Sequence, residues 1–194
     1  MKYEVSQIGS DDYLLLDLDQ REVELKVMAD MDAGVEVYYD RRWEVTASLT
    51  SWLEDHHAVY AGKRVLVIGA GVGIETAVIG RLAQKLFIND LSPVALELCS
   101  AQLEKNGVDN FEALLGRYEE IELPEVDLIV ASFLVYNKET LGAMRKFMSE
   151  NNCSFILMNE NLPDFVRCLK EIPNEVLFEE EGAMCVMFKD GSVN

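Results

Sequence analysis

The feature that most constrains this chain is an apolar run that leads directly into a glycine-rich loop. Residues 65–68 are Val-Leu-Val-Ile, and residues 69–73 are Gly-Ala-Gly-Val-Gly. An uninterrupted apolar run of this length is typical of a strand that is covered on both faces, as in a parallel sheet. Apolar residues at helical spacing follow the loop up to Leu82 and predict a helix. The strand, loop and helix together indicate an α/β fold.

Strands and helices continue to alternate from this point onward. Further apolar runs predict strands over residues 85–90, 111–115, 126–131 and 154–158. Helical spacing predicts the intervening helices, which begin at Ser92-Pro93, near Leu141 and near Phe165. The last two strand runs, 175–179 and 183–189, are separated by three residues, which permits an antiparallel hairpin but no parallel crossover. We therefore expect a Rossmann-like, mostly parallel seven-stranded sheet with an antiparallel C-terminal strand.

The N-terminal part of the chain has a different pattern. Residues 13–18 are mostly apolar and residues 22–27 alternate between polar and apolar, so we expect two strands that form a hairpin. Residues 35–39 indicate a third short strand. The spacing of apolar residues from Trp43 to Leu53 predicts an amphipathic helix that leads into the main domain.

The charge of the chain is strongly acidic and unevenly distributed. We place an N-terminal β-hairpin extension with its leading helix at residues 1–60, and the main domain at residues 61–194. The whole chain holds 35 Asp and Glu against 17 Lys and Arg, a formal net charge of −18. Residues 1–60 alone hold 14 acidic and 5 basic side chains, so the extension is either a solvated acidic face or a docking surface for a basic partner. This excess of acid argues against nucleic-acid binding through the phosphates, which requires Lys and Arg.

Other common classes of protein and site lack support in the sequence. No apolar run approaches the ~20 residues of a membrane span, and the N-terminal residues lack the pattern of a secretory signal, so we expect a cytoplasmic location and no membrane contact. The cysteines form no C-x-x-C pair and have no histidine at ligand spacing, which favours structural thiols and no metal site. These residues are Cys99, Cys153, Cys168 and Cys185.

The glycine loop and an acid further along the chain predict a nucleoside site. In an open α/β sheet, ligands bind beyond the carboxyl ends of the strands, where the strand order reverses. Gly69, Gly71 and Gly73 let the backbone approach a ligand closely, and the N-terminus of the following helix favours an anionic group. Asp90 ends the next strand, 21 residues beyond Gly69, and its carboxylate can accept hydrogen bonds from both hydroxyls of a ribose.

The spacing of the glycines indicates which nucleoside binds. A dinucleotide fingerprint, G-x-G-x-x-G, would place its third glycine at position 74, where this chain has Ile74. Here the third glycine is Gly73, which is the spacing of S-adenosylmethionine sites. The antiparallel last strand is typical of class I methyltransferases rather than dehydrogenases. A phosphate loop of the Walker type is excluded because no Gly-Lys-Ser/Thr follows the glycines.

A longer stretch of the chain resembles the seven-strand protein-lysine methyltransferases, the group that includes the lysine methyltransferase of the electron-transfer flavoprotein β subunit. The matching residues are Trp43 with Ala47, Leu49 and Leu53, then residues 65–73, Asn89-Asp90-Leu91-Ser92-Pro93 and Tyr136. The resemblance covers residues 43–136. It implies S-adenosyl-L-methionine as the cofactor and N-methylation of a protein lysine as the activity.

The chain departs from that group at three places. The group has Asp-x-x-Tyr after the fourth strand, but Phe133 stands three residues before Tyr136, so the acid is missing. Glu44 stands where the group has Pro. Gly116 and Arg117 stand where many class I enzymes have an acid that holds the adenine amino group. The missing Asp would help to hold or deprotonate the substrate amine.

The expected site follows from the loop, the strand ends and this resemblance. The residues expected at the cofactor are Trp43, Gly69, Ala70, Gly71, Gly73, Asn89, Asp90, Leu91, Gly116, Arg117 and Ser132. Ser132, Tyr136 and Asn137 follow the fourth strand and are the expected catalytic residues. Glu75, in the first helical turn after the glycines, is interpreted as a helix cap in preference to a partner of the methionine ammonium.

Two alternatives to lysine methylation remain open on the sequence. The enzyme could methylate a small amine or another metabolite, with the N-terminal extension as a lid. The chain could also bind S-adenosylmethionine without transferring its methyl group and act as an interaction module. The expected partner is accordingly a basic protein or a small amine, and the sequence leaves the oligomeric state open.

Overall fold

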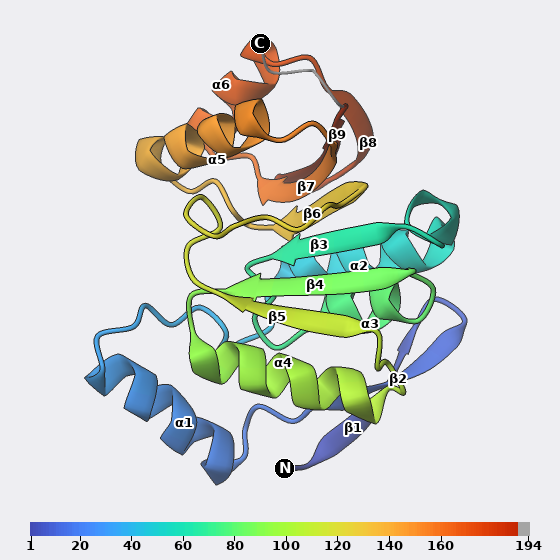
Figure 1. Ribbon diagram of the computed structural model, residues 1–194, viewed down its shortest axis with the longest axis vertical. Coiled ribbons are helices and arrows are strands. Elements are labelled where there is room, and N and C mark those ends of the chain that lie inside the picture. Colours follow the sequence, from blue (N-terminus) through green and yellow to red (C-terminus); the bar gives the residue numbers. More distant parts are fainter. Residues whose placement is uncertain (190–194) are drawn as a thin grey trace.

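The central element of the computed structural model, which describes residues 1–189, is a seven-stranded sheet (Figure 1). In spatial order its strands are β5 (Phe111–Leu115), β4 (Lys85–Asp90), β3 (Arg64–Ile68), β6 (Leu128–Ser132), β7 (Ser154–Glu160), β9 (Ala183–Phe188) and β8 (Glu175–Glu180). Strand β9 is antiparallel to both of its neighbours, and the remaining neighbouring pairs are parallel. The mostly parallel sheet with an antiparallel C-terminal strand is therefore confirmed.

The strand order reverses between β3 and β6. From β3 the chain proceeds outward through β4 to β5 and then returns to β6 on the other side of β3. The register pairs Val65 of β3 with Leu86 of β4 and with Leu128 of β6, so the carboxyl ends of these strands lie at one edge of the sheet. Ligand sites of open α/β sheets lie at such a reversal.

The two faces of the sheet are covered by different helices. Residues 1–189 form six α-helices, which are α1 (Arg21–Asp32), α2 (Glu44–Asp55), α3 (Ile74–Gly80), α4 (Pro93–Lys105), α5 (Lys138–Glu150) and α6 (Pro163–Glu171). Val65 and Val67 of β3 pack in a cluster with α2, α3 and α4. Leu66 and Ile68 point to the other face, where α5 and α6 cover the sheet. Both faces of β3 are buried, which explains why its sequence is apolar without interruption.

The N-terminal region contains a hairpin and a helix rather than three strands. The hairpin pairs β1 (Tyr3–Ile8) with β2 (Asp11–Leu16), and the chain continues into α1. The expected strand at 22–27 is therefore wrong. Its residues lie in α1, because Glu, Leu, Lys, Met and Ala in this segment favour a helix and a short alternating run is ambiguous. The expected third strand at 35–39 is also wrong, since these residues have no regular structure. The helix expected after Trp43 is confirmed as α2, which is followed by the short helix η1 (His57–Val59).

The N-terminal hairpin shares its core with the main sheet. Tyr13, Leu15 and Leu16 of β2 belong to the same hydrophobic cluster as the helices that cover β3. The buried side chain of Gln102 accepts a hydrogen bond from the backbone N–H of Leu16 at 2.6 Å and donates one to the carbonyl of Val72 at 2.7 Å. A single side chain thus connects the N-terminal region to the glycine loop. The division at residue 60 stays a prediction.

The cysteines and the helices add two observations on the described part of the chain. The four cysteines are separate thiols, and Cys99, Cys168 and Cys185 are buried.

None of the helices formed by residues 1–189 combines the length and the apolar character that crossing a bilayer requires.

Candidate active site

The glycine loop between β3 and α3 serves both packing and access. Gly69, Gly71 and Gly73 have φ angles of 64°, 53° and 83°, a region that favours glycine. A Cβ on Gly73 would lie 2.6 Å from the sulfur of Cys99, so this glycine allows α3 to pack against α4. A Cβ on Gly69 would meet no atom within 4 Å and would project into open space. Gly69 therefore leaves room in the cavity, whereas Gly73 is required for the close packing of α3 against α4.

Asp90 ends β4 beside this loop and is held by backbone groups. The N–H of Gly71 donates to its Oδ2 at 2.9 Å, and the N–H of Ser92 donates to its Oδ1 at 3.0 Å. Burial raises the pKa of this carboxyl above its usual value, while the two N–H donors oppose the rise. Each carboxylate oxygen can accept a further hydrogen bond, so the pair of ribose hydroxyls expected from the sequence has acceptors available.

Asn89 and Gly116 shape the neighbouring wall. The buried amide of Asn89 donates to the carbonyls of Leu114 and Gly116, both at 2.8 Å, and so fixes the chain where β5 ends. Gly116 has a φ of 134°, and Arg117 points its guanidinium to Glu119, with 2.8 Å between Nε and Oε1. The side chain of Asn89 thus holds the wall of the site.

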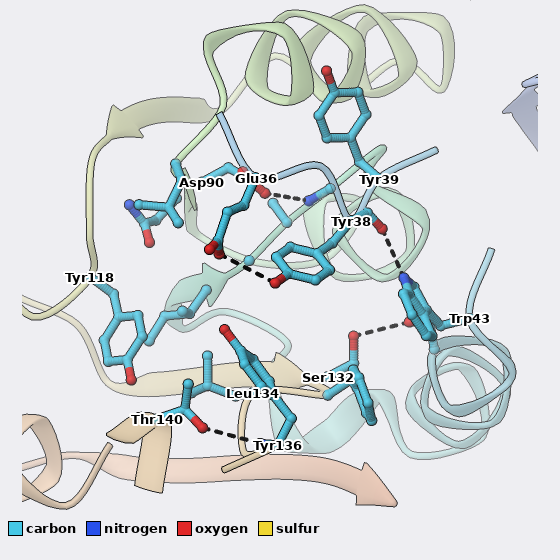
Figure 2. A pocket seen from close by; sticks show the side chains of 18 of the residues that line it. Glu36, Tyr38, Tyr39, Trp43, Asp90, Tyr118, Ser132, Leu134, Tyr136 and Thr140 are labelled. Atoms are coloured by element: carbon cyan, nitrogen blue, oxygen red, sulfur yellow. Dashed lines mark hydrogen bonds between the residues drawn. The ribbon is translucent and has the colours of Figure 1, made fainter. Parts of the chain in front are cut away.

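A cavity of about 550 Å³ opens at the strand reversal (Figure 2). Every residue that the sequence singled out for the cofactor or for catalysis lines it: Trp43, Gly69, Ala70, Gly71, Gly73, Asn89, Asp90, Leu91, Gly116, Arg117, Ser132, Tyr136 and Asn137. The structure therefore brings the expected residues together around one space. Their individual roles stay predictions.

A buried carboxyl group lies at the floor of this cavity. Glu75 is 2% exposed, and its carboxylate accepts a hydrogen bond from the Ser132 hydroxyl at 3.2 Å. The Ser132 oxygen also lies 3.0 Å from that of Thr46 on α2. Burial raises the pKa of Glu75 to about 7, while its own backbone N–H and Ser132 lower it and the charge of Asp90 adds to the rise. The carboxyl of Glu75 lines the cavity, and the capping role expected from the sequence stays a prediction.

Aromatic side chains form a continuous wall on the side of β6. Trp43 stacks on Phe133 with 5.0 Å between ring centroids and an interplanar angle of 19°. Phe133 in turn lies 6.3 Å from Tyr136, and Tyr136 lies 6.1 Å from Tyr38. Phe133 has a φ of 51°, a conformation that non-glycine residues adopt at a cost of ~1–3 kcal/mol when the surroundings enforce it. The residue that replaces the family's Asp therefore serves as a stacking partner for Trp43.

Asn137 and Tyr136 have different environments in the loop after β6. Asn137 caps α5: its side-chain oxygen accepts from the N–H of Thr140 at 2.9 Å, and its own N–H donates to the Thr140 hydroxyl at 3.1 Å. Tyr136 is 41% exposed and points toward the middle of the cavity (Figure 2). Of these two expected catalytic residues, Tyr136 has its functional group free to face a substrate.

Residues 33–43 cross the cavity between α1 and α2, and we call this segment the strap. Tyr39 in the strap is buried and donates from its hydroxyl to Asp30 Oδ2 at 2.7 Å, and the Ser92 hydroxyl donates to the same oxygen. Arg42 donates to the carbonyl of Leu16 at 2.9 Å. These contacts connect the strap to α1, to the start of α4 and to β2.

The strap and two other elements add cavity residues that the sequence analysis missed. These include Glu36, Tyr38, Thr46 and Tyr118. The alternation in residues 35–39 favours a strand, and no motif in this segment indicates that it crosses a cavity. The signal that the sequence offered for these cavity residues was the group of acidic and aromatic side chains at residues 36–40, shortly before Trp43.

Comparison with known proteins defines the family. A model of the lysine methyltransferase family matches residues 19–170. The chain belongs to this family. The lysine methyltransferases of the electron transfer flavoprotein β subunit from Mus musculus and Homo sapiens are 27% and 25% identical to it over 122 and 124 residues. These matches cover 62% and 63% of this chain but 48% and 47% of the relatives, so the chain spans about half the length of the curated relatives that it matches.

Solved structures agree with the lysine methyltransferase family in fold. A ribosomal protein L11 methylase from Lactobacillus delbrueckii superposes with a TM-score of 0.61 at 15% identity, over 77% of this chain and 80% of the methylase. An rRNA methylase from Streptococcus thermophilus superposes with a TM-score of 0.56 at 16% identity, over 77% of this chain and 98% of the other. Protein and RNA methylases thus share this fold, which by itself does not select the acceptor.

Membership of the lysine methyltransferase family implies S-adenosylmethionine as the methyl donor, and the cavity fits this cofactor. The space beside Gly69 leaves room for a ligand against the loop, and the carboxylate of Asp90 faces the same cavity. Glu75 adds a buried acid that is suited to a cationic ligand. S-adenosylmethionine combines a ribose with a sulfonium and an ammonium group, which matches this set of partners.

Proposed function

We propose that this protein catalyses the S-adenosylmethionine-dependent N-methylation of a lysine side chain in another protein. The observation that carries the proposal is a single cavity that joins a glycine loop and strand-end acid to an aromatic wall beside β6. The family and the named activity of the mouse and human relatives support the same assignment.

The residues of the chain would act mainly by alignment. Bound S-adenosylmethionine supplies a methyl group that is activated by a positively charged sulfur. Asp90 would hold the ribose, and the backbone at Gly69 and Gly71 would lie against the ligand. Holding two reactants in the correct orientation can lower a barrier by ~7–11 kcal/mol. Tyr136 would orient the amine, and the Ser132 hydroxyl would stay fixed by Thr46 and Glu75.

The acceptor amine must be neutral when it reacts, and the aromatic wall favours that state. An apolar environment disfavours the charged form of an amine and lowers its pKa. Phe133 and Leu134 line the cavity beyond β6, where the acceptor would approach. They would promote loss of the ammonium proton to water before the nitrogen attacks.

The exposure of the cavity mouth favours a protein acceptor over a small amine. Tyr38 and Tyr136, which line the cavity with 6.1 Å between their ring centroids, are 48% and 41% exposed. A mouth that remains open to solvent accommodates a lysine side chain that projects from a large surface. The net charge of −18 favours a basic acceptor protein and disfavours RNA.

The test begins with calorimetry and ends with identification of the methylated product. We expect S-adenosylmethionine to bind with measurable heat, and we expect tritiated methyl groups to enter protein when the enzyme is added to cell lysate. Mass spectrometry of the labelled band should locate the methyl group on lysine. Label confined to small molecules or to RNA would contradict the proposal, as would the absence of heat at millimolar cofactor.

A further inference from the structure

The strap places a carboxylate at the mouth of the cavity, opposite the loop after β6. Glu36 lines the cavity, and the hydroxyl of Tyr38 donates to its Oε2 at 3.2 Å. Figure 2 shows the polar ends of Glu36, Tyr38 and Tyr136 turned toward one another. Tyr39, the next residue of the strap, points away toward Asp30. The strap thus contributes two oxygen-bearing groups to the cavity, and the loop after β6 contributes the third.

The charge of Glu36 is not balanced by the basic residues of the strap. Arg41 pairs with Asp40, with 3.5 Å between Nε and Oδ1, and its guanidinium carbon lies 5.2 Å from the centroid of Trp43. Arg42 donates to a backbone carbonyl. Among the ion pairs formed by residues 1–189, none involves Glu36. Its carboxylate therefore remains able to pair with a cationic guest.

The groups around Glu36 suit a primary ammonium ion in particular. Such an ion has three N–H donors, and the cavity mouth offers a carboxylate and two phenol oxygens as acceptors. Partial burial, Tyr136 and Glu36 raise the pKa of Tyr38 to about 12, so the phenol stays neutral at ordinary pH. The ring of Phe133, which stacks on Trp43, lies next to this cluster with 6.3 Å between its centroid and that of Tyr136, and it adds an aromatic surface for the alkyl part of the guest.

We propose that Glu36, Tyr38 and Tyr136 form the binding site for the ammonium group of the acceptor. Glu36 then takes the place of the acid that Phe133 replaces after β6, and it does so from a segment distant in sequence. Glu36 is a positioning residue: it holds the acceptor as the ammonium ion before the proton is lost to water, and it takes no part in breaking the bond to sulfur. The assignment of this ammonium to a methyl acceptor rests on the proposed function, whereas ammonium binding itself can be measured without catalysis.

The test uses n-butylammonium as a probe for the lysine side chain. The chain has two tryptophans, so the indole N–H signals in the NMR spectrum report on Trp43 and Trp52 separately, and a Trp52→Phe variant assigns them. We expect a saturable shift of the Trp43 signal on titration with n-butylammonium chloride. An equal concentration of n-butanol with sodium chloride should give no saturable shift. The titration is made with and without S-adenosylhomocysteine.

Variants then separate a specific site from general acidity. Glu36→Gln should weaken n-butylammonium binding at least tenfold, because it removes the charge and keeps the size. Asp32→Asn removes the same charge from an exposed acid that does not line the cavity, and it should leave binding within twofold. Equal weakening in both variants, or unchanged binding in Glu36→Gln, would overturn the proposal.

The outcomes also distinguish this site from the proposed function. S-adenosylmethionine binding by Glu36→Gln, measured by calorimetry, should stay within twofold of the natural chain. Loss of butylammonium binding with intact cofactor binding supports the ammonium site. If the protein binds the cofactor but butylammonium gives no saturable shift, the ammonium site is wrong and the proposed methyltransferase function is unaffected. A chain that binds butylammonium through Glu36 but gives no heat with the cofactor contradicts the function and keeps the site.

Discussion

The proposed cofactor end of the cavity, formed by residues 69–73 and Asp90, uses a loop backbone, whereas the proposed acceptor end uses the side chains of Glu36, Tyr38 and Tyr136. At the cofactor end, the loop from Gly69 to Gly73 and the carboxylate of Asp90 are fixed by N–H groups at 2.9–3.0 Å. At the acceptor end, Glu36, Tyr38 and Tyr136 are exposed and come from the strap and from the loop after β6. The first end is thus held together by hydrogen bonds between the loop after β3 and the residues at the end of β4. The second end can change its specificity by substitution without disturbing the fold.

The largest effect that we expect is on stability, from Gly73→Ala at the cofactor end. The new Cβ would lie 2.6 Å from Cys99 Sγ at a φ of 83°. Left-handed backbone costs roughly 1–2 kcal/mol and overpacking ~1–3 kcal/mol, so the free energy of unfolding should fall by about 2–5 kcal/mol. Urea denaturation followed by circular dichroism measures this change.

Gly69→Ala is the matched control for that substitution. Its φ of 64° is also left-handed, but the added methyl group meets no atom within 4 Å. We expect a loss of roughly 1–2 kcal/mol of stability together with weaker cofactor binding, since the methyl group occupies space in the cavity. Equal stability losses in the two variants would show that packing against Cys99 is not what position 73 requires.

The second effect concerns cofactor affinity and Asp90→Ala. Hydrogen bonds to charged groups contribute ~1.5–3 kcal/mol, so removal of the carboxylate should weaken S-adenosylmethionine binding by about 10–100-fold. Calorimetry measures the affinity, and the exposed Asp109→Ala, which lies outside the cavity, controls for the change in net charge. Unchanged affinity in Asp90→Ala would mean that the ribose is held elsewhere.

The two ends also differ in how much of them the sequence predicts. The cofactor end depends on residues close together in the chain: a strand, its loop and an acid 21 residues later. Local spacing is enough to specify such a site. The mostly parallel sheet and the antiparallel β9 followed in the same way, from the alternation of strand and helix patterns and from the short link before Ala183.

The acceptor end depends on contacts between distant segments and was predicted only in part. Tyr136 was identified because it lies close to β6, but Glu36 and Tyr38 reach it from about 100 positions earlier in the chain. Alternating residues at 22–27 and 35–39 fit a strand, yet the first segment forms α1 and the second forms the strap. Periodicity over five or six residues does not decide between these states.

The third prediction concerns pH and the buried Glu75 between the two ends. Its pKa is raised to about 7, so the carboxyl is largely protonated at pH 6 and ionised at pH 8. A cationic ligand binds the ionised form better, so S-adenosylmethionine should bind about tenfold more tightly at pH 8 than at pH 6, with release of a proton. Calorimetry in buffers of different ionisation enthalpy measures that proton.

The control for this pH dependence is Glu75→Gln. The groups that face Glu75 are Ser132, Asp90 and its own N–H, and burial also raises the pKa of Asp90. Because Glu75→Gln removes this carboxyl and leaves Asp90 in place, the part of the pH dependence that disappears in the variant belongs to Glu75. Affinity that falls as pH rises, or an unchanged profile in Glu75→Gln, would contradict the role of Glu75 as a partner for a positive charge.

The smallest effects that we expect are those of Tyr38→Phe and Tyr136→Phe at the acceptor end. Each substitution removes one hydrogen bond from the ammonium ion to a phenol oxygen. Because both phenols are exposed, we expect this bond to contribute ~0.5–1.5 kcal/mol, so n-butylammonium should bind roughly threefold more weakly in each variant. Cofactor affinity should stay within twofold, because the ring of each tyrosine and its stacking are retained. NMR titration measures the first quantity and calorimetry the second. If either variant weakened the cofactor more than the ammonium probe, that tyrosine would belong to the cofactor end, and the separation of the cavity into two ends would fail.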